Sequence, residues 1–250
     1  MKRFPKTEYF SLFSVAAGII GFAMQSWLLT TVDAKGLLVK GHISAVISFV
    51  LFAIVVAVNG MFLRNFKPDG GYEHLFPKSK VAGIGSIVAA IVMGYCAMLP
   101  VASPVLGLLV KVFGLATVVG LGLSGYGRMQ DKLPNCLIYG VVCLFLIFRS
   151  LVFCQGWSAE LQVERFFFPL MASLFLLITA YYRAALGVDL KNCRQYLFFR
   201  QLALFCCLLS LAGVDKLFYL AGAVWMATDF CTPDAYGKYA QQGGSQDVSA

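Results

Sequence analysis

The sequence has 250 residues, of which 60% are hydrophobic and 13% are charged, and its mean hydropathy is +0.79. A water-soluble domain of this size cannot cover so much apolar surface, so the composition excludes that class and indicates a surface in contact with lipid. The net charge of +8 does not indicate a nucleic-acid-binding protein, because the basic residues flank apolar segments and form no continuous face.

Eight apolar segments follow one another along the chain, separated by short clusters of charged residues. Each is about 16 to 24 residues long, close to the length that a hydrocarbon core of ~30 Å requires of a helix. Because lipid offers the backbone no hydrogen bonds, each segment should be an α-helix. The segments are 8–30, 42–63, 81–99, 104–126, 134–154, 165–185, 195–212 and 216–231. We therefore predict an all-α fold, a polytopic transmembrane bundle of about eight helices.

The helix count depends on the last two segments. Gly213, Asp215 and Lys216 interrupt an apolar stretch that is too long for one crossing, which favours two short helices and a tight turn. Seven crossings with a bent last helix are the alternative. We assign residues 1–232 to one transmembrane domain and expect residues 233–250 to form a short, polar, disordered tail in the cytoplasm.

The distribution of Lys and Arg predicts the orientation, since these residues are enriched in cytoplasmic loops. If the N-terminus is cytoplasmic, fourteen of the 20 lie on the cytoplasmic side: Lys2, Arg3, Lys6, Arg64, Lys67, Lys78, Lys80, Arg128, Lys132, Arg183, Lys191, Arg194, Arg200 and Lys238. Four lie outside: Lys35, Lys40, Arg165 and Lys216. The other two, Lys111 and Arg149, lie within apolar segments. This asymmetry places both termini in the cytoplasm.

Lys111 lies on the fourth segment among small residues. Gly107, Gly114, Gly122 and Gly125 follow one another at helical spacing there, and small residues allow a neighbouring helix to approach closely. We expect Lys111 to share this stripe, so its side chain should point into the bundle and away from lipid.

Several polar residues are predicted to meet at the outer side of the bundle. Charged residues within membrane segments are costly, so Lys111 and Arg149 are functional candidates. The residues that we expect to join them in a ligand-binding site are His42, Glu160, Glu164 and Asp215. Such a site suits a small anionic or zwitterionic ligand. Alternatively, Arg149 extends to the headgroups, while Lys111 also extends toward the outer surface or forms an ion pair with a carboxylate.

No catalytic or cofactor-binding motif stands out, so we predict neither a catalytic residue nor a metal or cofactor. Ser124 lies in a GxSG sequence that rhomboid-type intramembrane proteases share, but a serine nucleophile needs a base beside it. Of the two histidines, His42 is predicted outside and His74 lies in a cytoplasmic loop. The Tyr181-Tyr182-Arg183 run is typical of an anchor at the membrane interface.

Several stretches resemble a known group of proteins. They are Arg149-Ser-Leu-Val-Phe-Cys-Gln-Gly-Trp157, Phe166-Phe-Phe-Pro-Leu-Met-Ala-Ser-Leu-Phe175, Ala180-Tyr-Tyr-Arg-Ala-Ala-Leu186 and the helix start Gly41-His42. Together they are similar to a pattern in uncharacterised multipass membrane proteins of Gram-positive bacteria. The resemblance covers about half of the chain and carries no known activity. It implies that the chain belongs in a bacterial cytoplasmic membrane.

Two hypotheses about function follow. The first is a component that binds or transports a small anionic or zwitterionic ligand at an outward-facing pocket, which requires a cavity between helices. The second is a non-catalytic membrane scaffold or subunit that binds a partner protein, which predicts a tightly packed bundle without such a cavity. Both place the chain in contact with the lipid bilayer and neither involves nucleic acid.

Overall fold

The computed structural model describes residues 6–31, 42–64, 78–130, 136–157, 163–186 and 193–228, and every helix or strand assigned in them is an α-helix. The helices are α1 (Lys6–Thr30), α2 (Ile43–Arg64), α4 (Lys80–Met98), α5 (Pro104–Met129), α6 (Leu137–Trp157), α7 (Val163–Leu186), α8 (Cys193–Ser210) and α9 (Lys216–Thr228). Their bounds differ from the predicted segments by three residues or fewer. For the described chain, the all-α prediction of eight helices is therefore confirmed, while the predicted tail at 233–250 lies outside it.

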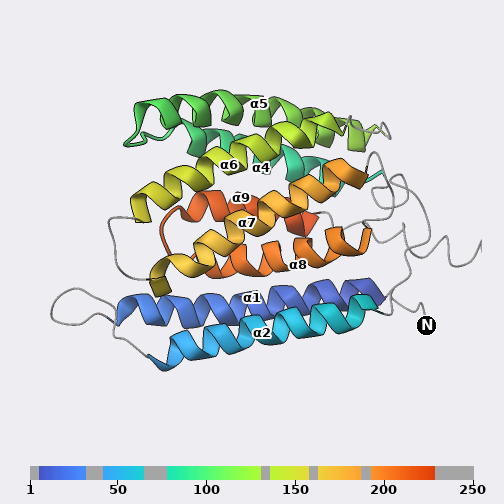
Figure 1. Ribbon diagram of the computed structural model, residues 1–250. Helices are drawn as coiled ribbons and strands as arrows, with labels where there is room; N and C mark the ends of the chain where they lie inside the picture. The colour runs from blue at the N-terminus through green and yellow to red at the C-terminus, as the bar shows by residue number, and fades with distance from the viewer. Residues whose placement is uncertain are drawn as a thin grey trace, which may run out of the picture.

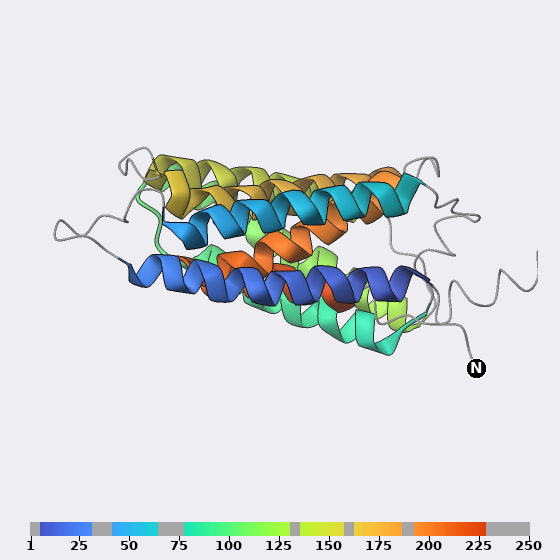
Figure 2. The same cartoon turned by 90° about the horizontal axis from the view of Figure 1, so that it is seen from below.

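The helices form one bundle and run along a common direction (Figures 1 and 2). The helix α8 lies between α1 and α7 and contacts both, while α9 contacts α4 and α8. We call the end of the bundle that holds the last turn of α1 and the first turn of α9 the predicted outer end. The opposite end, where α1 begins and α5 finishes, is the predicted inner end.

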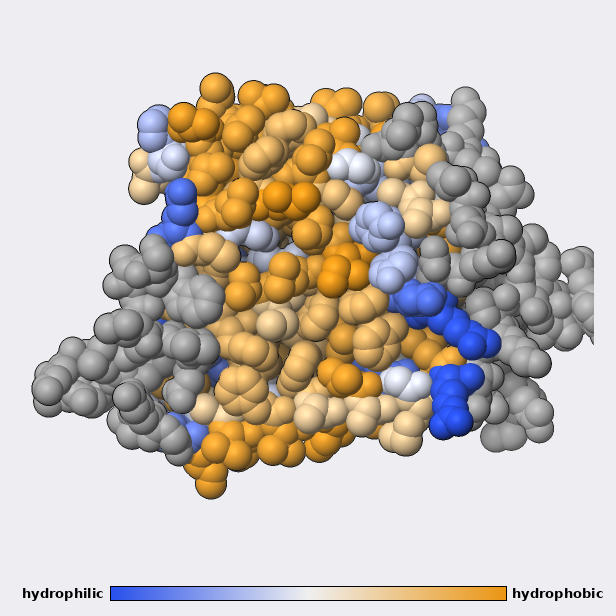
Figure 3. All heavy atoms as spheres, in the orientation of Figure 1, coloured by the Kyte–Doolittle hydropathy of each residue, from blue (hydrophilic) through white to orange (hydrophobic). Residues whose placement is uncertain are grey.

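Six of the helices in the described chain, all except α8 and α9, are long and apolar enough to cross a membrane. Figure 3 shows the corresponding apolar surface across the middle of one face, with hydrophilic residues gathered toward both ends. This indicates an integral membrane protein. The helix α8 departs from the pattern because it carries Arg194, Arg200 and Gln201, and α9 has only 13 residues. Most of α8 is buried among other helices, including Arg200 and Gln201, so these two side chains face protein instead of lipid, whereas Arg194 in the first turn is exposed.

The backbones of α4 and α5 come into close contact. A methyl group added at Gly125 would lie 2.6 Å from the carbonyl oxygen of Gly83, and one added at Gly83 would lie 2.6 Å from the carbonyl oxygen of Gly125. The predicted small-residue stripe is therefore correct for Gly125, and for Gly114, which packs against Ala97. It is wrong for Gly122, where an added methyl group would meet no atom within 4 Å.

Candidate functional site

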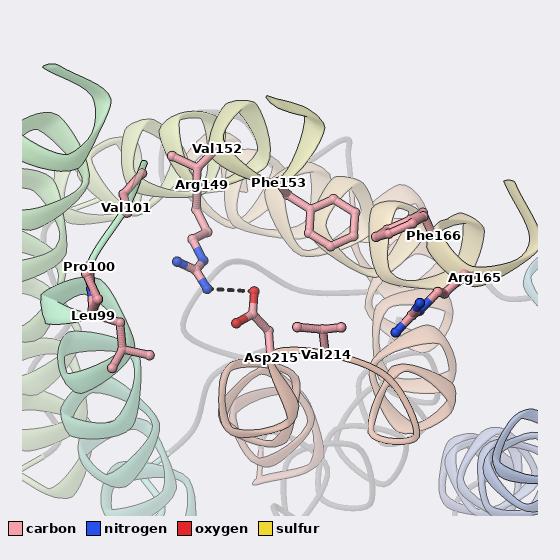
Figure 4. A pocket seen from close by; sticks show the side chains of 10 residues that line it. All are labelled: Leu99, Pro100, Val101, Arg149, Val152, Phe153, Arg165, Phe166, Val214 and Asp215. Carbon is pink, nitrogen blue, oxygen red and sulfur yellow. Dashed lines mark hydrogen bonds and ion pairs between the residues drawn. The ribbon is translucent and has the colours of Figure 1, made fainter. Parts of the chain in front are cut away.

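Arg149 lies on α6 near the predicted outer end and is 8% exposed. Its Nη2 donates a hydrogen bond of 2.7 Å to Oδ2 of Asp215. A cation in an apolar helix is costly unless it has a partner, so the carboxylate offsets part of the cost of burying the guanidinium. The pair connects α6 to the turn between α8 and α9 (Figure 4).

Asp215 occupies an unusual backbone conformation immediately before α9. Its φ of 61° places it in the left-handed region, which costs most residues about 1–2 kcal/mol and which Asp tolerates better than most. Its carbonyl oxygen accepts hydrogen bonds from the N–H groups of Phe218 at 2.9 Å and Tyr219 at 3.3 Å. The first turn of α9 therefore starts at Asp215, while the carboxylate extends to Arg149.

Two aromatic residues in the first turn of α9, Phe218 and Tyr219, fix the position of the helix below this ion pair. The Arg149 guanidinium lies 5.5 Å from the centre of the Phe218 ring. The Tyr219 hydroxyl donates a hydrogen bond of 3.1 Å to the carbonyl oxygen of Pro169 on α7, and lies 3.4 Å from the Ser173 hydroxyl. The start of α9 is thus fixed to α6 on one side and to α7 on the other.

A pocket of about 510 Å³ opens above the ion pair. Its lining comes from the α4–α5 connection, α6, the first turn of α7 and the α8–α9 turn, and consists of Leu99, Pro100, Val101, Arg149, Val152, Phe153, Arg165, Phe166, Val214 and Asp215 (Figure 4). Two arginines and one aspartate are the charged residues of the described lining. Such a volume is typical of a small-molecule site.

The structure brings two of the predicted site residues together, Arg149 and Asp215. It adds Arg165, which the sequence places on the outer side, at the first residue of the predicted segment 165–185, but not in the site. Because α7 starts at Val163, two residues before Arg165, this side chain belongs to the first helical turn and joins the pocket. Helix starts are the least certain feature of a hydropathy pattern, and no motif marks this arginine.

Lys111 does not have the predicted orientation. Its side chain is exposed on α5, it does not line the pocket, and no described residue forms an ion pair with it. An α-helix turns about 100° per residue, so Lys111 is displaced by about 40° from Gly107 and about 60° from Gly114. That displacement places the preceding residue, Val110, in the interior and Lys111 on the surface.

The other predicted site residues lie apart from the pocket or outside the described residues. His42 precedes α2, where its Nδ1 accepts a hydrogen bond of 3.3 Å from the Ser44 backbone N–H, and its ring lies against Trp27. It does not line the pocket. Glu160 and the side chain of Glu164 lie outside the described part of the chain.

A second polar cluster, near the predicted inner end, was not expected. Arg183 is 1% exposed, and its guanidinium lies 4.7 Å from the centre of the Tyr139 ring and 5.8 Å from that of Trp225. The prediction of an interfacial anchor is therefore wrong for Arg183, which is buried. Ser124 lies 2.5 Å from the Tyr139 hydroxyl. Among the described residues no histidine lies beside it, because His42 is at the opposite end of the bundle.

Comparison with protein-family models, curated proteins and solved structures found no match. The resemblance to multipass proteins of Gram-positive bacteria remains a prediction. The case for a function therefore depends on the chemistry of the pocket.

Proposed function

We propose that this protein is a membrane component that binds a small anionic or zwitterionic ligand in the pocket at Arg149, on the outer side of the membrane. The observation that carries the proposal is a nearly buried arginine at the base of a 510 Å³ pocket. A guanidinium presents several donors in a fixed plane and suits carboxylate or phosphate groups.

The other charged residues of the pocket are consistent with such a ligand. Arg165 places a second guanidinium in the lining, where the described residues include two arginines and one aspartate. The Asp215 carboxylate can form an ion pair with the ammonium group of a zwitterion. When the anionic group of a ligand binds Arg149, the carboxylate moves away from the guanidinium. Charge complementarity of this kind favours anions over neutral compounds.

The cavity also distinguishes the two hypotheses. A scaffold that acts only through its loops predicts a bundle without a cavity between its helices, whereas a ligand-binding component requires one. The pocket above Asp215 lies among four segments of the bundle, which supports ligand binding.

Thermal stabilisation of the purified protein tests the proposal. A ligand that binds only the folded state at 100 times its Kd stabilises that state by about 2.7 kcal/mol. We expect carboxylates, phosphates or amino acids from a metabolite panel to raise the Tm of the wild type. Lys111→Met is the matched control, because it removes an exposed cation that does not line the pocket.

The double variant Arg149→Met with Asp215→Asn should lose the ligand response. It removes both charges of the pair, so no carboxylate is left without its partner and the bundle should stay folded. A ligand that stabilises this variant as much as the wild type, or a panel without any stabilising anion, would contradict the proposal.

A further inference from the structure

We propose that the ligand of this pocket is an amphiphile, with an acidic headgroup at Arg149 and an apolar tail that lies along the exposed side of α9. This inference rests on the proposed function and names the class of ligand. It is carried by the lining of the pocket, the short length of α9 and the exposed apolar residues that follow from the pocket along α9.

The lining is mostly apolar. Three of its ten residues are charged, and the other seven are Leu99, Pro100, Val101, Val152, Phe153, Phe166 and Val214. The rings of Phe153 on α6 and Phe166 on α7 lie 5.6 Å apart in an edge contact and form one wall (Figure 4). A small, fully hydrophilic ion would leave this wall without an apolar partner, whereas an amphiphile covers it.

The helix α9 is too short to reach across a bilayer. Its 13 residues span about 20 Å, against about 30 Å for the hydrocarbon core. In Figure 1 its first turn lies inward of the outer ends of α1, α5 and α6. The floor of the pocket, at Asp215, is therefore recessed below the tops of the surrounding helices, close to where headgroup and tail of a lipid meet.

Three exposed apolar residues, which we call the apolar strip, follow one another from this floor along α9. The strip consists of Val214, Leu217 and Leu220, which are 55%, 49% and 45% exposed, whereas Phe218 and Tyr219 of the same turn are buried. Val214 also lines the pocket, so the strip begins inside it. On its other sides α9 packs against α4 and α8. A tail that follows the strip stays in hydrocarbon while its headgroup reaches Arg149.

The charged residues at the pocket indicate that the headgroup of the ligand is acidic. Arg149 and Arg165 both line the pocket, and Lys216, the residue after Asp215, is exposed at the start of α9. A phosphate monoester or a carboxylate carries net negative charge and satisfies donors of this kind, whereas in a choline headgroup the trimethylammonium group offsets the single negative charge of the phosphodiester. The same acidic group can come from a membrane amphiphile or from a free, water-soluble anion, so the experiment must separate these sources.

Thermal unfolding in nanodiscs of neutral phosphatidylcholine provides that separation, with three probes. Oleoyl lysophosphatidic acid has the acidic headgroup and a tail, glycerol 3-phosphate has the headgroup alone, and oleoyl lysophosphatidylcholine has the tail with a choline headgroup. We expect the first to raise the Tm at a total concentration at least tenfold lower than glycerol 3-phosphate, and the third to leave it unchanged. The response should disappear in Arg149→Met with Asp215→Asn.

Leu217→Trp tests whether the tail of the ligand lies along α9, because the larger side chain occupies the apolar strip. It should weaken the response to lysophosphatidic acid at least threefold and leave that to glycerol 3-phosphate unchanged. Leu108→Trp is its control, because Leu108 is a lipid-exposed residue near the outer end of α5. An equal effect of both tryptophan variants, or none from Leu217→Trp, would overturn the path along α9.

The remaining outcomes separate this inference from the proposed function. Stabilisation by glycerol 3-phosphate without a gain from the tail overturns the amphiphile and leaves an anion-binding pocket. Equal responses to both lysolipids show only partitioning of the tail, which also overturns the amphiphile. If no anion, with or without a tail, stabilises the wild type, both proposals are wrong.

Discussion

The Arg149 guanidinium and the Asp215 carboxylate are separated by 66 positions in the sequence and by 2.7 Å in space. Their side chains are 9% and 28% exposed, so the pair lies at the boundary between the interior and the pocket. It is the point at which α6 holds the turn between α8 and α9. The stability of that turn and the charge of the pocket therefore depend on the same two residues.

The first prediction concerns the loss of one partner. Arg149→Met should destabilise the bundle by about 1–3 kcal/mol, because it leaves the Asp215 carboxylate without its donor. Adding Asp215→Asn should recover most of that loss, since the stranded charge is then removed. Equilibrium unfolding in mixed micelles measures both values. If the two single changes add without coupling, the pair does not stabilise the turn.

The second prediction separates the backbone of Asp215 from its charge. Asp215→Gly and Asp215→Ala both remove the carboxylate, but only alanine is strained at a φ of 61°. We expect Asp215→Ala to be less stable than Asp215→Gly by about 1 kcal/mol. Asp215→Asn serves as the control, because asparagine tolerates the left-handed region. Equal stability of the alanine and glycine variants would argue against this conformation.

The third prediction concerns the contact between α4 and α5. Gly125→Ala places a methyl group 2.6 Å from the Gly83 carbonyl oxygen, so the helices must separate, at a cost of about 1–3 kcal/mol. Gly122→Ala, on the same helix, meets nothing within 4 Å and should be neutral or stabilising by up to about 1 kcal/mol. Thermal unfolding of the two variants compares them directly, and an inverted order would reject this helix packing.

The helices were predictable because a helix in lipid must form its backbone hydrogen bonds within itself, so an apolar segment of sufficient length indicates a helix. Even the break at Gly213 and Asp215 was visible, since a glycine and two charges interrupt the apolar run. The depth of α9 within the bundle could not be predicted from the sequence. Its short length becomes meaningful only when the neighbouring helices are seen to extend beyond its first turn.

The site was predicted less completely. The sequence places Arg149 and Asp215 at the same end of the bundle, but their pairing depends on how α6 packs against the α8–α9 turn. The expectation for Lys111 is wrong because residues four and three positions apart differ by about 40° and 60° on a helix, enough to separate the interior from the surface. Arg183 is buried by Tyr139 and Trp225, which come from other helices.

The most direct test of an outward-facing pocket is the labelling of Val214, which lines the pocket and is 55% exposed. Val214→Cys, in a background without the native cysteines, is treated in intact bacterial cells with a thiol reagent that cannot cross the membrane. Lys80→Cys, at the start of α4 on the predicted inner end, is the control. We expect the thiol at position 214 to react in intact cells, and the thiol at position 80 to react only after permeabilisation. The opposite pattern would place the pocket on the cytoplasmic side and contradict the account.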